Sequence, residues 1–279
     1  MTRRSPALDC RTAIGGPAPA ARSALLADWY RDHGRHELAW RGSRDRWSIL
    51  VSEVMLQQTQ ASRVADAWPE FIGRFPTPAA MAEAGPGAVI TAWGRLGYPR
   101  RARRLWEAAR LISASGWPED LTELPGVGRY TAGAILAQAD DADVAAVEVN
   151  VRRVVERCAG RALSEREAEA EMVRLARPLR GRDRLLALMD VGATLCRPRE
   201  PRCPECPLRR RCASRGPRSS EVRSRQGAFA GSFRQRRGQV MARLRAGTPV
   251  AVTDLDADAL ASLVADGLAV VARDHAALP

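Results

Sequence analysis

The chain has 279 residues, of which 46% are hydrophobic, and its 44 cationic side chains exceed 32 acidic ones to give a net charge of +12. Every cation is an arginine, because the sequence contains no lysine. Phosphate-binding loops of the Walker type and enzymes that form a Schiff base on lysine both need that residue, so both classes are excluded. No apolar run approaches the ~20 residues that span a bilayer, and residues 1–22 lack a signal-peptide core. We therefore expect a cytoplasmic protein without structural disulfides.

The chain divides into four parts. Residues 1–22 are rich in Arg, Ala, Gly and Pro and predict a disordered basic arm. Residues 23–215 form a series of helical patterns with little alternation of period two, which predicts an all-α core. The Ser-, Arg- and Gly-rich stretch 216–232 predicts a linker. Two helical patterns and a short apolar run then predict a small winged-helix-like module over 233–279.

Two carboxyl groups lie in apolar surroundings. In the helix expected around Glu53, Ile49 and Leu56 share its face. Loss of solvent raises the pKa of such a carboxyl and suits it to general acid catalysis, although a glutamate on a polar helix edge is the ordinary alternative. Glu148 precedes another expected helix, whose N-terminal dipole favours the ionised form. One protonated and one ionised carboxyl form the pair that breaks glycosidic bonds.

A glycine-rich turn separates two helical patterns in the middle of the core. Its sequence is Leu124-Pro125-Gly126-Val127-Gly128-Arg129-Tyr130. The glycines allow a sharp turn and a close approach to another surface, and the amides that open the next helix can bind a DNA phosphate. A plain helix–helix turn is the more common interpretation of such a segment. The candidate contacts to the DNA backbone are Gly126, Val127, Gly128 and Arg129.

Four of the six cysteines are closely spaced, as Cys196-x6-Cys203-x2-Cys206-x5-Cys212. Four thiolates at short spacings enclose a soft metal centre, and the spacing alone leaves both zinc and an iron–sulfur cluster open. The other two, Cys158 and Cys10, are predicted to lie in the core and in the arm.

The positive charge is concentrated around and after these cysteines. Residues 197–245 contain 15 arginines and three acids, and the rest of the chain is balanced. A localised basic segment indicates a polyanion, with nucleic acid as the first choice. A solvated arginine-rich tail is the alternative.

Taken together, these segments resemble the adenine DNA glycosylases of the MutY type, in the endonuclease III superfamily of helix–hairpin–helix glycosylases. The match covers about residues 23–215, in the family's order. The Gln-Gln-Thr segment at 57–59 and the cysteine spacing are highly specific to this family. The glycine-rich turn at 124–130, which forms the hairpin, is shared with many DNA-binding proteins. The matching segments are 38–41, 52–60, 93–98, 124–134, 150–154, 189–193 and the four cysteines.

The resemblance implies two helical lobes with DNA across them. One is a six-helix barrel, about residues 44–147. The other, about 23–43 and 148–215, holds a [4Fe–4S] cluster on Cys196, Cys203, Cys206 and Cys212. The implied activity is base excision repair: removal of adenine mispaired with guanine or 8-oxoguanine in double-stranded DNA, which requires the base to be flipped out. We expect a monomer at the bacterial nucleoid with no membrane partner.

The resemblance also implies roles for individual residues. Glu53 protonates the purine N7, and Glu148 stabilises the oxocarbenium-like sugar, supported by Tyr130 and Asn150. The residues expected at the adenine are Trp40, Arg41 and Asp190. Those expected to wedge into the duplex and touch the opposite guanine are Gln58, Thr59, Leu96 and Tyr98. The arginines expected on phosphates are Arg197, Arg199 and Arg202.

The sequence departs from the family pattern in two places. Glu148 stands where the family usually has aspartate, and its extra methylene moves the carboxylate by more than ~1 Å. A misplacement of about 1 Å can cost on the order of a hundredfold in rate. We expect Glu148 to keep the role with a rearranged backbone and reduced activity. The stretch after residue 216 is too short for the Nudix-like domain of longer members, which leaves the preference for 8-oxoguanine over guanine open.

Two other functions remain open. Bifunctional relatives carry a catalytic lysine where this chain has Tyr130, so a monofunctional glycosylase that leaves the strand uncut is predicted. Some relatives that remove thymine also have tyrosine there, so a thymine or pyrimidine mismatch glycosylase is one alternative. A non-catalytic paralogue that binds DNA lesions is the other. Glu53 and the Gln-Gln-Thr segment favour adenine.

Overall fold

A computed structural model of the chain describes residues 19–216 and 227–279, with side chains from Leu25 onward in the first helix. Most of the predicted arm, including Cys10, and the middle of the predicted linker lie outside the described residues. The described part holds eleven α-helices and three short strands, which confirms the predicted all-α core. The helices are α1 (Pro19–His33), α2 (Arg46–Leu56), α3 (Ala61–Arg74), α4 (Pro78–Trp93), α5 (Arg100–Ser115), α6 (Arg129–Ala139), α7 (Val149–Ala159), α8 (Glu165–Ala176), α9 (Gly181–Asp190), α10 (Phe233–Leu244) and α11 (Ala257–Ala265), and the strands are β1 (Val250–Ala251), β2 (Val270–Ala272) and β3 (His275–Ala277).

Local side-chain chemistry sets several helix boundaries. The Asp45 carboxylate caps α2 by accepting the Ser48 amide at 2.8 Å. Ser164 and Glu167 form a reciprocal capping box at the start of α8. Helix α4 bends at Gly85, whose φ of 80° lies in the left-handed region that glycine adopts without strain.

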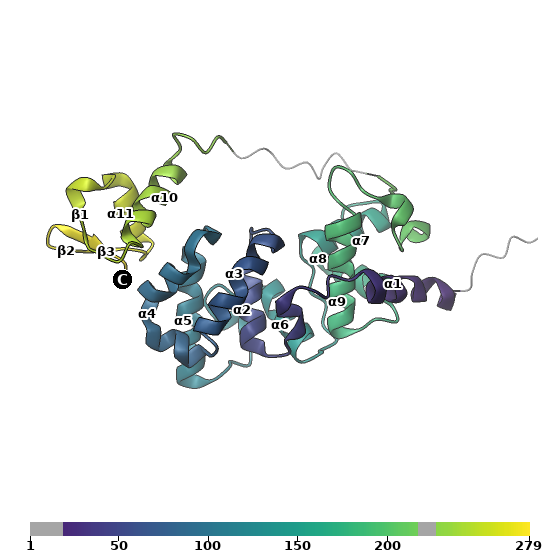
Figure 1. Cartoon of the computed structure of the whole chain (residues 1–279). Helices are drawn as coiled ribbons and strands as arrows, with labels where there is room; N and C mark the ends of the chain where they lie inside the picture. The colour runs from purple at the N-terminus through teal and green to yellow at the C-terminus, as the bar shows by residue number, and fades with distance from the viewer. Residues whose placement is uncertain (1–18, 217–226) are drawn as a thin grey trace, which may run out of the picture.

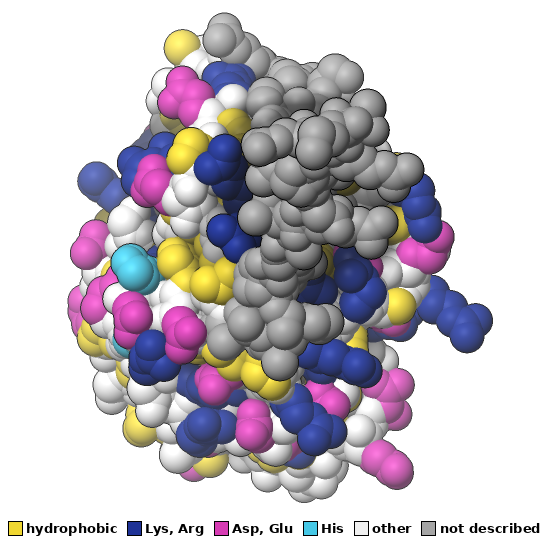
Figure 2. All heavy atoms as spheres, turned by 90° about the vertical axis from the view of Figure 1, so that its right-hand side faces the viewer, with side chains coloured by type: hydrophobic (Ala, Val, Ile, Leu, Met, Phe, Trp, Pro, Cys, Tyr) yellow, Lys and Arg dark blue, Asp and Glu magenta, His cyan; other side chains and the backbone are white. Residues whose placement is uncertain are grey.

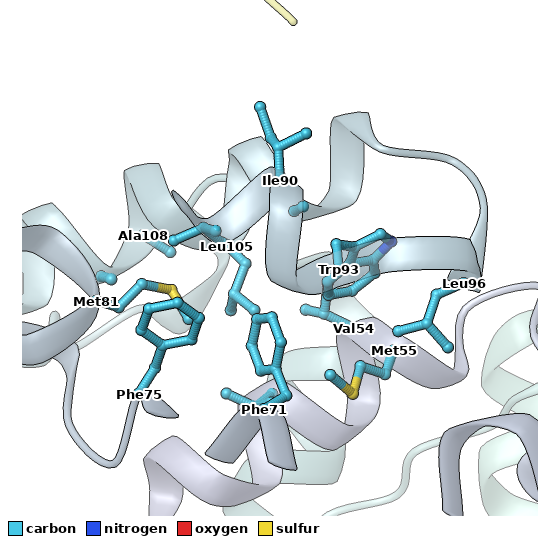
Figure 3. Close-up of a cluster of buried hydrophobic side chains, with 14 of the residues drawn as sticks. Val54, Met55, Phe71, Phe75, Met81, Ile90, Trp93, Leu96, Leu105 and Ala108 are labelled. Atoms are coloured by element: carbon cyan, nitrogen blue, oxygen red, sulfur yellow. The ribbon is translucent and has the colours of Figure 1, made fainter. Parts of the chain in front are cut away.

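The helices form two lobes with separate hydrophobic cores (Figure 1). Helices α2 to α5 surround the first core, in which Phe71, Trp93 and Leu105 meet (Figure 3). The second core is built by α1, α7, α8 and α9. Helix α1 therefore packs against helices that lie far from it in the sequence, α8 and α9. Helix α6 lies at the boundary, because Ile135 belongs to the first core and Ala134 to the second.

The C-terminal residues form a small unit against the first lobe. Helices α10 and α11 pack together beside an antiparallel sheet in the order β1-β3-β2. The Arg103 guanidinium of α5 donates to the Gly267 carbonyl, and Arg100 lies 3.5 Å from the Asp266 carboxylate. Gly87 of α4 faces the chain end so closely that an added Cβ would stand 2.6 Å from the Pro279 carbonyl. The unit is thus anchored on α4 and α5.

Charges are nearly balanced in the C-terminal unit. Residues 227–279 hold six arginines and five acids, and two of the α10 arginines are paired, Arg236 with Asp256 at 3.0 Å and Arg237 with Asp266 at 2.7 Å. Arginine and acidic side chains are also intermixed on the face seen in Figure 2. The excess positive charge therefore falls mainly on the cysteine loop and the residues that follow it. Among the described residues, no helix has the length and apolar character needed to cross a membrane.

Candidate active site

Glu53 is a buried acid on the face of α2 that packs against α6. Its side chain is 5% exposed, and its Oε1 accepts a hydrogen bond of 2.8 Å from the Gln138 amide of α6. Burial raises the pKa of the Glu53 carboxyl, against the lowering effects of Gln138 and Tyr130, and the nearby charge of Glu148 raises it further. The raised pKa of Glu53 agrees with its predicted role as a general acid.

Glu148 is the N-cap of α7, with its side chain folded back over the first turn. Its Oε1 accepts the Val151 amide at 2.9 Å, and its Oε2 accepts the Asn150 side-chain amide at 3.0 Å. Burial raises its pKa, while the backbone amides of the helix start and the nearby Arg153 charge act in the opposite direction. Burial and the amides of the helix start therefore act on the pKa of Glu148 in opposite directions.

Tyr130 and Asn150 complete the group around the two carboxyls. Tyr130 is the second residue of α6, and burial together with the charges of Glu53 and Glu148 raises the pKa of its phenol, which stays neutral. The side-chain oxygen Oδ1 of Asn150 accepts from Arg153 at 2.6 Å, and Arg153 also donates to the Cys196 backbone carbonyl at 2.6 Å. A continuous set of hydrogen bonds thus joins Glu148 to the cysteine loop.

The residues predicted at the adenine lie together and are buried. Asp190, at the end of α9, accepts from the Arg41 guanidinium at 2.6 and 2.7 Å and from the Arg35 side chain at 2.7 Å. Burial alone would raise the pKa of Asp190, but the bonds and charges of Arg41 and Arg35 lower it below its usual value. Trp40 is buried beside Trp68, with ring centroids 6.5 Å apart. Both oxygens of Asp190 are thus engaged by arginines.

The predicted wedge residues come from two loops that Arg101 holds together. Gln58 and Tyr98 are exposed, with φ of 57° and 47°, a strained backbone region for residues with side chains. Arg101 donates to the Met55 carbonyl at 2.9 Å on one side and to the Gly97 carbonyl at 3.0 Å on the other.

The remaining two predicted wedge residues are less accessible than Gln58 and Tyr98. Thr59 is half-buried, and its hydroxyl accepts from Arg101 at 3.0 Å. Leu96 is buried in the first core, next to Trp93 and Met55 (Figure 3). The structure therefore brings all four to one place but leaves Gln58 and Tyr98 as the exposed pair.

The glycine-rich turn connects α5 to α6 as predicted. Gly126 has a φ of 83°, and an added Cβ would lie 3.2 Å from the Cβ of Arg104. Gly128 is the N-cap of α6, without a capping side chain over the first amides, while Val127 is buried. The Arg129 guanidinium is exposed and paired with Glu169 at 2.7 Å.

The four spaced cysteines line one cavity, together with Arg157 and Leu195 among others. The Arg157 guanidinium lies 3.3 Å from the Cys196 sulfur and donates to the Arg197 carbonyl at 2.9 Å. Burial raises the pKa of Cys206 to about 12, whereas a hydrogen bond from Cys158 lowers that of Cys212 to about 5. Cys158 itself is buried in the second core, as predicted.

The arginines predicted to contact phosphates lie in the loop between the first two cysteines. Arg199 and Arg202 are exposed, while Arg197 is half-buried. The Arg202 guanidinium is 3.9 Å from the Glu205 carboxylate, a long distance for an ion pair. Two of the three therefore present their charge to solvent.

Sequence reasoning missed three residues that organise the site: Gln138, Arg101 and Arg153. Each is buried and bonded to a predicted site residue or to the backbone of a predicted site loop. The usable signal for Gln138 was a polar side chain among the small and aliphatic residues of α6, since buried polar groups need a partner. For the two arginines nothing in the sequence distinguishes them from the many exposed ones.

Known proteins resemble this chain in sequence over most of its length. Residues 51–178 match the HhH-GPD superfamily of base excision DNA repair proteins. An adenine DNA glycosylase of Mycolicibacterium smegmatis is 43% identical over 266 residues, which cover 87% of this chain and 90% of that protein. The adenine DNA glycosylase of Homo sapiens is 36% identical over 237 residues, or 76% of this chain and 42% of the human protein.

Among solved structures, a thermostable thymine-DNA glycosylase matches with a TM-score of 0.60 and 27% identity, over 70% of this chain and 95% of that one. An endonuclease III–DNA complex shares the fold, with a TM-score of 0.60, 22% identity and the same coverage. With nine-tenths of a curated relative covered at 43% identity, the chain belongs to the adenine DNA glycosylase family.

Proposed function

We propose that this chain removes adenine from mispairs with guanine or 8-oxoguanine in double-stranded DNA, by hydrolysis of the N-glycosidic bond. Relatives named as adenine DNA glycosylases match over most of the chain. The observation that carries the proposal is the arrangement of two carboxyls held by amide donors, the buried Glu53, which accepts from Gln138, and the half-buried Glu148, which accepts from Val151 and Asn150. Acid assistance to the leaving base and a carboxylate near the sugar are the two requirements of this reaction.

The hydrogen bonds favour a division of labour between the two acids. The charge of Glu148 raises the pKa of the buried Glu53 carboxyl, as expected for two neighbouring acids. Glu148 accepts from a backbone amide and from Asn150, and such donors stabilise a carboxylate. Glu53 is buried, and its amide donor is the Gln138 side chain. The proton therefore resides on Glu53, which delivers it to the purine N7, while ionised Glu148 stabilises the developing positive charge on the sugar.

The other predicted residues are assigned by position. Trp40, Arg41 and Asp190 would receive the flipped adenine, and Gln58 and Tyr98, held in strained exposed loops, would fill the gap left in the duplex. The hairpin residues Gly126 to Arg129 and the loop arginines Arg197, Arg199 and Arg202 would bind the DNA backbone.

The four cysteines fit the [4Fe–4S] cluster implied by the family. They line one cavity, and four thiolates are the ligand set of such a cluster. Cys196, Cys203, Cys206 and Cys212 would hold the cluster, which would supply a rigid, thiolate-bound centre for the arginine loop. Arg157 fixes the start of that loop from inside.

The absence of lysine sets the outcome of the reaction. A glycosylase that also cuts the strand traps the sugar with a side-chain amine, and this sequence offers none. We therefore expect an intact strand with an abasic site as product.

The test is incubation of the whole protein with duplexes that carry adenine opposite guanine, adenine opposite 8-oxoguanine, or thymine opposite guanine. Alkali then reveals abasic sites. We expect cleavage at adenine only after alkali, and a loss of about 10²–10⁴-fold in Glu53→Gln, the usual contribution of a general acid, with DNA binding retained. Cleavage at thymine would favour the thymine-DNA glycosylase activity named for the similar structure. Binding without excision, unchanged in Glu53→Gln, would leave a non-catalytic lesion binder.

A further inference from the structure

We propose that Gln138 is a positioning residue that selects which oxygen of Glu53 carries the proton delivered to the base. This inference rests on the proposed function, because it assigns Gln138 a part in the acid step of adenine removal. Its basis is one hydrogen bond in a buried place: the Gln138 amide nitrogen donates to Glu53 Oε1 at 2.8 Å, and Gln138 is only 2% exposed.

Gln138 lies on a face of α6 where apolar residues surround it. Ala134, Ile135 and Ala137 are all fully buried in the same helix. A polar side chain in such a place needs a partner, because burial removes the water that would otherwise satisfy it. The partner here is the carboxyl group assigned as the acid, so the placement of this glutamine is tied to the reacting group.

The backbone of Gln138 is itself held in place. Its carbonyl accepts from the Arg182 guanidinium at 2.6 Å, and the same guanidinium nitrogen donates to the Ser43 carbonyl at 3.0 Å. The end of α6 is therefore fastened to α9 and to the loop before α2. A side chain on a fastened helix end can hold its partner in one rotamer, as precise catalysis requires.

Two of the charged groups that act on Glu53 are bonded to other partners. Arg41 is bonded twice to Asp190, and Glu148 is bonded to Val151 and Asn150. Tyr130 is neutral, because burial and the two acids raise its pKa, and its hydroxyl lowers the pKa of Glu53 in the same direction as Gln138. Gln138 is thus the uncharged amide that fixes one oxygen of the Glu53 carboxyl.

The consequence concerns the two oxygens of Glu53. An amide N–H can only donate, so Oε1 must act as an acceptor and the proton of neutral Glu53 resides on Oε2. The same bond is stronger to the ionised carboxylate, so it opposes the effect of burial and keeps the acid from becoming too weak to release its proton. Gln138 would thereby set both the direction of the proton and the pH range of the reaction.

The experiment is the pH–rate profile of single-turnover excision from a duplex with adenine opposite 8-oxoguanine. An acid that must be protonated gives a rate that falls as pH rises through its pKa. Gln138→Met keeps the length of the side chain and removes the donor. The pH at which the rate falls should therefore rise by about one unit, the equivalent of one hydrogen bond to a charged group. The plateau at low pH should drop about tenfold, because the carboxyl is no longer oriented.

Two further variants support the interpretation. Gln138→Glu keeps the shape of the side chain but faces Glu53 with a second carboxyl, so the pH at which the rate falls should rise still further. This variant replaces Gln138→Met in the test if the methionine variant does not fold. Gln239→Met makes the same change at an exposed position of α10 and should leave the profile unchanged. Thermal unfolding checks that each variant is folded.

Three results separate the ways in which the proposal can fail. If Gln138→Met scales the rate equally at every pH, the residue only packs, and the proposal is overturned. If the rate of Gln138→Met falls at a lower pH than that of the wild type, Gln138 accepts a hydrogen bond from the protonated Glu53 carboxyl. That result also overturns the proposal. If the wild-type protein excises no adenine at any pH, the proposed function fails instead.

Discussion

Replacement of Asp190 by asparagine tests how strongly the buried carboxylate holds the adenine-side residues together. Asp190 is fully buried and accepts bonds from Arg41 at 2.6 and 2.7 Å and from Arg35 at 2.7 Å. Removal of one partner from a buried ion pair leaves the other charge uncompensated, which costs about 3–5 kcal/mol. Because such a domain has only about 5–15 kcal/mol of stability, Asp190→Asn should lower the melting temperature by on the order of 10 °C.

The assay measures the free energy of unfolding in urea at pH 7 for Asp190→Asn. A control variant, Glu167→Gln, neutralises a carboxylate at the surface. Glu167→Gln also converts a carboxylate to an amide, in a pair whose side chains are 61% and 46% exposed, Arg161 and Glu167, and glutamine still completes the capping box. We expect little change there, as is usual for exposed pairs. Equal effects in the two variants would refute the reasoning that burial gives the Asp190 pair its weight.

The effect of Asp190→Asn should also depend on pH. The arginines lower the folded-state pKa of Asp190, so its stabilising contribution is complete above the unfolded-state pKa of about 4 and is lost as the pH falls through the lower folded-state value. The difference between wild type and variant should therefore be constant from neutral pH down to about pH 4 and shrink below it. A difference that grows on acidification would contradict this assignment.

Two other predictions follow from the bonds around the site. In Glu148→Asp the side chain that accepts from Val151 and Asn150 is one methylene shorter, as in the family's usual residue, so single-turnover excision should rise, by up to about a hundredfold; a rate that stays the same or falls would show that Glu148 does not reduce activity. Arg101→Met leaves the carbonyls of two loops without their donor, so the free energy of unfolding should fall by about 3 kcal/mol; an unchanged unfolding midpoint in urea would show that water replaces the guanidinium.

Much of the fold was predictable because its signals are local. The caps at Asp45 and Ser164 and the turn at Gly126 are encoded in short segments of sequence, and the structure confirms the all-α core predicted for residues 23–215. Strands β1 and β3 were not predicted, since two or three residues are too few to show alternation and their pairing depends on contacts across the unit.

The site was predictable where chemistry fixes the residue type. An acid in apolar surroundings, four closely spaced cysteines and a glycine-rich turn together indicate one chemistry, whereas each of them alone is ambiguous. Gln138 and Arg101 escaped prediction for a physical reason: their roles depend on which backbone carbonyl or carboxyl lies opposite after the helices pack. The role of Leu96 illustrates the same limit, because it is buried in the first core although its loop is exposed at Tyr98.

The arginine-only composition acquires a structural meaning from these contacts. The charge pattern alone favoured phosphate binding, yet six arginines of the described residues are buried. Arg101 joins the two wedge loops, Arg153 joins Asn150 to the cysteine loop, and Arg182 joins α6 to the loop before α2. A guanidinium presents five donors in a plane and can reach several carbonyls at once, whereas an ammonium offers three from one point. A lysine at any of these positions would satisfy fewer acceptors, so the buried arginines hold the parts of the active site in register, and the exposed loop arginines are the ones available to bind DNA.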